Sequence, residues 1–221
     1  MARPTAVRTT LVADARADTE QRFLDAAERL LISVGYAAIT TRRLSEEAGA
    51  NAGLVHYYFG TMEELFLQVL ERFTSRLLER QRPMYAAPGT YLDKWRAAMS
   101  YLEADRPYQK IWWELQAMAW NRPEFQPRVA RVREAWGDAM RGAVTEALKR
   151  YRLDRGDLSP DDWVTLIVTF NEGLILERLS GITRGHDSLL AAIDRWLVTR
   201  EKVSRKPRKS KAGKGKRHAR P

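Results

Sequence analysis

The chain has 221 residues, of which 44% are hydrophobic, and it contains no cysteine. This length is enough for one or two domains with a buried core. The missing cysteines exclude disulfide bonds and thiolate metal or redox sites. The opening residues lack the apolar stretch of a signal peptide, and no apolar run approaches the roughly 20 residues that cross a bilayer. We therefore expect a soluble, cytoplasmic protein without a membrane partner.

The net charge of +10 is concentrated at the C-terminal end. Residues 201–221 contain ten Lys or Arg and one acid, whereas residues 1–60 contain seven Arg and seven acids. Bulk charge therefore does not identify the front of the chain as a nucleic-acid-binding segment. We expect the tail from residue 203 onward to be disordered, because it is rich in Lys, Arg, Gly and Ser. It could bind DNA nonspecifically through counterion release, or act only as a solubilising end.

Apolar residues recur at helical spacing along the chain, and no convincing run of alternating β-branched residues is present. A first helix is expected from Asp18, a residue type that caps helix N-termini, to Gly35, which can end a helix in the left-handed conformation. Two short helices are expected next, at 41–48 and 52–58, and each is followed by a glycine that breaks it.

A long fourth helix is expected from Thr61 to about Gln81. Thr61 with Glu64 three positions later is a capping box, which favours a helix start. Pro83 marks a boundary, because proline cannot continue the helical hydrogen bonding. The remaining helices are expected at about 90–104, 107–120, 124–151, 160–180 and 187–202.

The most informative stretch runs from Thr40 to Phe66. Two short helices joined by a tight turn need a small residue where they cross, a glycine at the bend and apolar residues that face inward. Ser45 is the small residue and Gly49 makes the bend. The inward-facing positions are Leu44, Ala48, Ala50 and Val55. The pattern predicts a helix-turn-helix unit, whose second helix lies in the DNA major groove.

The stretch resembles the DNA-binding head of the TetR family of regulators, over about residues 18–75. The resemblance is carried by Thr40-Thr41-Arg42-Arg43-Leu44, by the Ala48-Gly49 turn, and by Gly53 followed by Tyr57, Tyr58 and Phe59. It implies an all-α fold, in which an N-terminal three-helix helix-turn-helix head joins a larger helical ligand-binding and dimerisation domain. It also implies a DNA-binding transcription regulator, expected to be a repressor, rather than an enzyme, with no cofactor or metal.

The resemblance assigns Thr41 to a phosphate and Arg42 to a base contact, because a guanidinium can pair with guanine O6 and N7. The matching positions in the recognition helix are Ala52, Gly53, Leu54, His56, Tyr57 and Tyr58. Tyr57 and Tyr58 are expected to contact phosphate or bases, with core packing as the alternative for Tyr58, and Leu54 could meet a thymine methyl. Family members often carry Lys where this chain has Ala52 and Met62, so two phosphate anchors are missing. His56 replaces a frequent tyrosine.

The expected helix at 107–120 has almost no polar face, so it should be surrounded by protein. Polar residues among apolar neighbours need partners, and an apolar cavity with a few polar groups is typical of a ligand site. The predicted effector site, for a small and largely apolar molecule, consists of Trp112, Trp113, Glu114, Gln116, Trp120 and Phe170. The alternative is an ordinary core in which Glu114 pairs with an internal arginine.

The helices expected within 160–202 carry apolar residues that can pair with their copies, which is where the family forms homodimers. Two heads related by a twofold axis would read a near-palindromic operator in double-stranded DNA. An effector that favours one head separation would change operator affinity. The expected parts of the chain are a flexible arm at 1–17, the helix-turn-helix domain at 18–60, a connecting helix at 61–82, the ligand-binding and dimerisation domain at 83–202, and a disordered basic tail at 203–221.

Two other function classes remain as alternatives. An enzyme is disfavoured because the three histidines, His56, His186 and His218, are widely spaced and no phosphate-binding glycine loop or nucleophile elbow is present. An architectural DNA-binding protein that depends on its basic tail would bind DNA according to charge rather than sequence.

Overall fold

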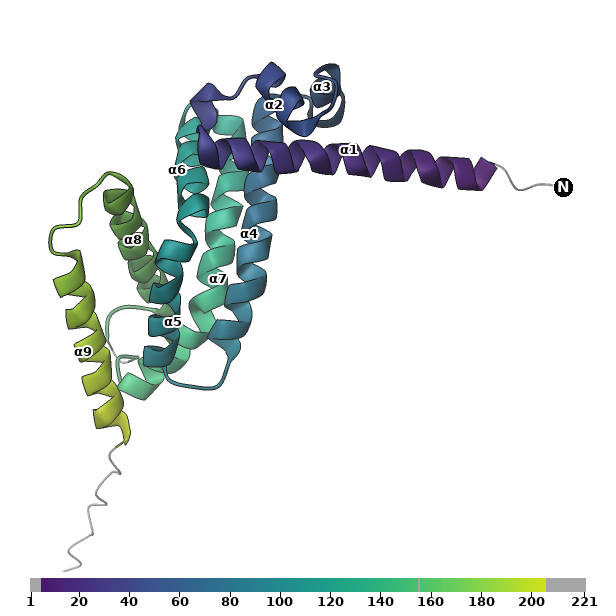
Figure 1. Ribbon diagram of the computed structural model, residues 1–221. Coiled ribbons are helices and arrows are strands. Elements are labelled where there is room, and N and C mark those ends of the chain that lie inside the picture. The colour runs from purple at the N-terminus through teal and green to yellow at the C-terminus, as the bar shows by residue number, and fades with distance from the viewer. Residues whose placement is uncertain (1–4, 155, 206–221) are drawn as a thin grey trace, which may run out of the picture.

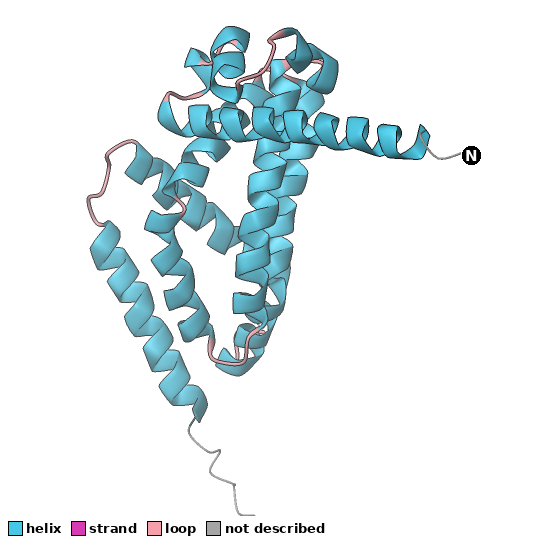
Figure 2. Ribbon diagram, turned by 45° about the vertical axis from the view of Figure 1, so that its right-hand side comes forward, coloured by secondary structure: helices cyan, strands magenta, loops and turns pink. Residues whose placement is uncertain are grey.

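The computed structural model describes residues 5–154 and 156–205. Every regular element within those ranges is helical (Figures 1 and 2), so the predicted all-α class is confirmed. The elements in chain order are α1 (Thr5–Ser33), η1 (Tyr36–Ala38), α2 (Thr41–Ala48), α3 (Gly53–Phe59), α4 (Met62–Ala86), α5 (Tyr91–Ala104), α6 (Arg106–Trp120), η2 (Pro123–Phe125), α7 (Gln126–Tyr151), α8 (Pro160–Leu179) and α9 (His186–Arg205).

The short helices of the head begin and end at the residues that the sequence indicates. The Thr40 hydroxyl accepts a hydrogen bond from the Arg43 amide at 3.2 Å and caps α2. Gly49 ends α2 in the left-handed conformation, with φ 60°. The Thr61 hydroxyl accepts from the Glu64 amide at 3.0 Å and caps α4. Each threonine satisfies an amide that would otherwise lack a partner in the first helical turn.

The first helix starts at Thr5, well before Asp18, so the prediction of a flexible arm up to residue 17 is wrong for residues 5–17. This segment contains no glycine or proline, and four of its residues are alanine, the strongest helix former. The capping preference of Asp18 therefore does not interrupt a helix that is already formed. Figure 1 shows the consequence: α1 is a straight rod that crosses the top of α4 and projects beyond α3.

The fourth helix continues through Pro83 to Ala86, beyond the predicted boundary at Gln81. Proline removes one backbone donor, and here it does so only in the last turn, where little helix remains to be disrupted. The terminal carbonyls find another donor. The ammonium group of Lys94, which is 6% exposed, donates to the carbonyls of Tyr85 and Ala87 at 2.8 and 2.5 Å.

The later helices lie within a few residues of their predicted ranges. The difference at the C-terminal end is that α9 continues to Arg205, so residues 203–205 are helical rather than part of a disordered tail. The rest of the predicted tail, 206–221, lies outside the described residues, as do residues 1–4 of the predicted arm.

The head and the body share one hydrophobic core. It contains Phe23 and Val55 from the head, Phe66 from α4 and Leu115 from α6, each at most 2% exposed. In the body, α4 and α7 run side by side (Figure 1), α8 packs on α7, and α9 packs on α5 and α7. None of the described helices combines the length and the apolarity needed to cross a bilayer.

Candidate nucleic-acid interface and body cavity

The helix-turn-helix packs as its sequence pattern predicts. Leu44 and Val55 are fully buried, and Ser45 is 8% exposed where the two helices cross. The guanidinium of Arg22, on α1, donates to the Ala48 carbonyl at 3.1 and 2.7 Å and to the Gly49 carbonyl at 2.5 Å. These bonds satisfy carbonyls at the end of α2, and they fix the turn against α1.

The predicted DNA-binding residues lie on the outer face of α2 and α3, and they differ in how far they are exposed to solvent. Arg42, Gly53, His56 and Tyr57 are exposed, whereas Thr41, Ala52, Leu54 and Tyr58 are half-buried. Tyr57 is the most prominent apolar group on this face, with 64% of its surface exposed. The structure therefore brings all eight residues to one end of the molecule, and what they contact stays a prediction.

Three of these side chains have intramolecular partners that a DNA contact would have to keep or replace. Arg42 forms an ion pair with Glu46 at 2.8 Å, in which both side chains are largely exposed. Such a surface pair contributes little, so Arg42 can exchange it for a base or phosphate. Nδ1 of His56 lies 2.9 Å from the Gly60 carbonyl. The Tyr58 ring packs against Phe23 and against its neighbour Phe59.

Arg16 also lies at the outer face of α2 and α3, although we expected it to belong to a flexible arm. Its guanidinium carbon lies 5.3 Å from the ring centre of Tyr57 and 5.7 Å from that of Tyr58. The two rings themselves meet edge to face, with centres 5.2 Å apart. No sequence signal links Arg16 to residues some forty positions away, because the contact exists only if α1 continues before Asp18.

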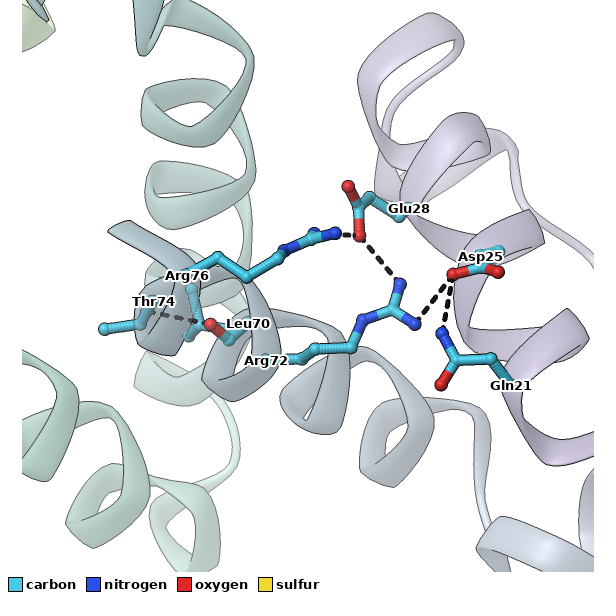
Figure 3. A network of polar contacts seen from close by, with 7 residues as sticks. All are labelled: Gln21, Asp25, Glu28, Leu70, Arg72, Thr74 and Arg76. Carbon is cyan, nitrogen blue, oxygen red and sulfur yellow. Dashed lines mark hydrogen bonds and ion pairs between the residues drawn. The ribbon is translucent and has the colours of Figure 1, made fainter. Parts of the chain in front are cut away.

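A network of charged side chains fixes α1 to α4 (Figure 3). Arg72 on α4 reaches Asp25 and Glu28 on α1, each at 2.7 Å, and Arg76 reaches the same oxygen of Glu28 at 2.5 Å. Gln21 donates to Asp25 at 2.9 Å. Because Arg72 and Glu28 are mostly buried, this network is screened less by solvent than a surface pair. The head is thereby tied to the N-terminal half of α4.

The sixth helix is tied to the far end of α1. A carboxylate oxygen of Glu114 accepts a hydrogen bond from the Tyr36 amide at 2.5 Å, and the ammonium group of Lys110 donates to the Ile32 carbonyl at 3.0 Å. The chain turns between these two points at Gly35, with φ 79° and ψ 165°. A Cβ atom at Gly35 would lie 2.7 Å from the other Glu114 oxygen. Glu114 thus holds a backbone amide, not the internal arginine of the alternative interpretation.

The body contains a cavity of about 80 Å³ between α4, α5, α6, α7 and α8. Trp112 and Trp113 line it, as predicted for an effector site, together with Tyr85, Tyr101, Tyr108 and Trp136. Three polar atoms of lining residues, Trp113 Nε1, Trp136 Nε1 and Asn171 Oδ1, are buried without a hydrogen-bond partner. The wall thus combines aromatic and aliphatic side chains with a few polar atoms that are free to hydrogen-bond a ligand.

The charges in the cavity wall are paired. Arg133 and Glu172 form an ion pair at 3.0 Å, and Arg80 is paired with Asp105. Burial raises the pKa of the Glu172 carboxyl above its usual value, and the charge of Arg133 partly opposes this shift. The matched pairs leave no formal charge in the wall unbalanced, which suits a neutral ligand.

The other predicted effector residues lie elsewhere. Trp120 is 62% exposed, Glu114 faces the head, and Gln116 is half-buried away from the cavity lining. Phe170 lines a second, more open hollow of about 570 Å³ between α5, α7, α8 and α9. The structure does not bring the six residues together. Among the described residues, no cluster of three potential metal ligands is present.

The last two helices expose large apolar side chains. Leu166 is 53% exposed, Leu176 43%, Leu189 45% and Trp196 40%, and Ile182 between the helices is 52% exposed. Several of these residues also border the second hollow. Exposed apolar surface of this extent marks interaction sites on soluble domains.

A helix-turn-helix head that shares its core with a helical body containing a cavity defines the class of one-component DNA-binding transcription regulators. Residues 23–69 match the family described as bacterial regulatory proteins, tetR family. The N-terminal part of the chain is therefore similar to the DNA-binding region of TetR-family transcription regulators. Its fold is similar to that of solved transcription regulators.

Individual relatives agree with this assignment. The transcriptional repressor AcnR of Corynebacterium glutamicum is 33% identical over 66 residues, which are 30% of this chain and 35% of that protein. The chain thus matches only about a third of this relative's length. A transcriptional regulator from Rhodococcus sp. RHA1 has a similar fold, with a TM-score of 0.65 and 19% identity over 86% of this chain and 96% of that one. FadR from Bacillus subtilis, solved with stearoyl-CoA, has a TM-score of 0.60 and 13% identity over 81% and 97%.

Proposed function

We propose that the protein is a repressor that binds a near-palindromic DNA operator as a homodimer and is released by a small, largely apolar effector. The observation that carries the proposal is the exposed face of α2 and α3, which is supported from beneath by a fully buried core. A recognition helix must present side chains outward while its other face is fixed, and α3 does both.

In this proposal the base contacts come from Arg42 and the exposed residues of α3, and the phosphate contacts from Thr41 and the two tyrosines. Arg42 gives the strongest discrimination, because bidentate pairing with guanine is worth about 1–3 kcal/mol against a wrong base. Exchanging its exposed ion pair with Glu46 costs little. Leu54 is half-buried, so only part of its side chain is available to a thymine methyl.

The dimer in this proposal forms through α8 and α9. Both helices carry exposed apolar residues, and burial of such surface stabilises association by roughly 25 cal/mol per Å² before the entropic cost of association. A twofold axis through this region would place the two heads for two operator half-sites.

The effector in this proposal binds in the cavity lined by Trp112 and Trp113. Both residues lie on α6, and Glu114 on the same helix is bonded to the head. A ligand that displaces α6 therefore changes the position of the head relative to the body, and its effect on operator affinity equals its difference in affinity for the two arrangements. The acyl chain of the stearoyl-CoA bound to FadR is long and apolar, which supports an effector with a largely apolar part for this fold.

The experiment that tests the proposal is selection of bound sequences from a random DNA pool. It would use the full chain and a variant that ends at Arg205. Enrichment of one palindromic motif by both forms supports a sequence-reading repressor. Enrichment of no motif, with binding that disappears when residues 206–221 are removed, would favour the alternative of an architectural protein that binds through its basic tail.

A further inference from the structure

Arg16 differs from the other arginines of the head because its guanidinium lies over aromatic rings. Its guanidinium lies over the rings of Tyr57 and Tyr58, at the exposed end of the recognition helix. Arg16 itself is exposed, and Tyr57 is 64% exposed. A planar guanidinium that lies over an aromatic face keeps its N–H donors at its edges, where they remain available to another partner.

The other arginines among the described side chains of residues 16–60 have oxygen partners. Arg22 bonds two carbonyls at the end of α2, Arg29 pairs with Glu47, and Arg42 pairs with Glu46. Arg43 has only a distant contact, at 3.5 Å, with a carbonyl. Among the described side chains of residues 16–60, no carboxylate forms an ion pair with Arg16.

The sequence of the head adds a second observation. Residues 1–60 contain no lysine. A DNA-binding surface needs basic anchors, because phosphate contacts give most of the affinity and set the register on the duplex. An exposed arginine held over the rings of Tyr57 and Tyr58, beside the recognition helix, meets this need.

We propose that Arg16, held over Tyr57 and Tyr58, binds a backbone phosphate of the DNA at the edge of each half-site. The inference rests on the proposed docking of α3 in the major groove. The phosphodiester oxygen accepts hydrogen bonds from the guanidinium edge, while the tyrosine rings hold the side chain in place. Because the side chain is already positioned, its loss of rotamer freedom on binding is small.

The test measures the DNA affinity of the full chain and of its variants. Fluorescence anisotropy of a labelled duplex gives this affinity at several salt concentrations. Arg16→Ala is expected to lower affinity about tenfold for each half-site, for the selected motif and a scrambled duplex alike. The slope of log affinity against log salt should fall by about one for each half-site. Arg16→Lys keeps the charge and should keep the slope, but lose part of the affinity because the planar group is gone.

Arg82→Ala is the matched control. Arg82 is an exposed arginine near the C-terminal end of α4, which Figure 1 places at the opposite end of the molecule from the head. Its removal lowers the net charge equally and should leave affinity and slope unchanged. If Arg16→Ala and Arg82→Ala have the same effect, the proposed phosphate contact is refuted.

The outcome also separates this inference from the function on which it rests. If the wild type selects a motif and Arg16→Ala binds it with unchanged affinity and slope, only the role of Arg16 is wrong. If the wild type selects no motif, the operator-binding function fails and the Arg16 contact fails with it.

Discussion

Replacement of Gly35 by alanine tests the junction between the head and α6. The backbone at Gly35 has φ 79° and ψ 165°, a combination that side-chain-bearing residues rarely adopt. Forcing alanine into such a region costs about 1–3 kcal/mol. The new Cβ would also lie 2.7 Å from a Glu114 oxygen, so the carboxylate must move away.

Movement of Glu114 breaks its hydrogen bond with the Tyr36 amide, which is 2.5 Å long. A hydrogen bond to a charged group contributes about 1.5–3 kcal/mol. Gly35→Ala should therefore lower the free energy of unfolding by about 2.5–6 kcal/mol in total. In a Glu114→Ala background the carboxylate is absent, and the same glycine substitution should cost only the backbone strain of about 1–3 kcal/mol.

The assay is urea unfolding of the wild type, the two single variants and the double variant, all at one protein concentration because dimerisation affects apparent stability. The difference between the two backgrounds measures the coupling, which we expect to be about 1.5–3 kcal/mol. An equal cost of Gly35→Ala in both backgrounds would show that the Cβ does not meet Glu114. A cost below about 1 kcal/mol would contradict the backbone conformation itself.

Three further predictions concern the function. Tyr57→Ala and Arg42→Ala should each lower operator affinity while leaving helix content and oligomeric state intact, and unchanged affinity in both variants would refute the assigned interface. Leu189→Glu places a charge on the exposed apolar surface of α9 and should convert the dimer to a monomer in light scattering; an unchanged mass would exclude this surface from the interface. Removal of residues 206–221 takes away most of the basic tail, and should weaken all DNA binding and flatten its salt dependence, unless the tail makes no phosphate contacts.

The head could be predicted from the sequence because its signals are local. The threonine caps, the glycine at 49 and the apolar spacing of α2 and α3 each act within a few residues, and the structure agrees with all of them. The start of α1 could not be predicted from a capping residue alone, since Asp18 occurs within a longer stretch of helix-forming residues.

The effector residues were harder to predict, because a helical wheel tells which residues are buried but not which neighbour they meet. Trp112 and Trp113 line the cavity, whereas Glu114 turns to the head and Trp120 to solvent, although all four lie on one helix. The partners of Glu114, Arg72 and Arg16 lie some forty or more positions away in the chain. Such contacts depend on tertiary packing, which no local pattern encodes.

The length of α4 has a mechanical consequence. Its 25 residues span about 37 Å, with the head fixed near its N-terminal end and the cavity-lining residues Gln81 and Tyr85 near the other. A lever of this length that tilts by about 5° about its far end moves the head by about 3 Å, close to the rise of roughly 3.4 Å per base pair in DNA. A displacement too small to disturb the packing of the body is therefore large enough to shift each head by one step along the groove.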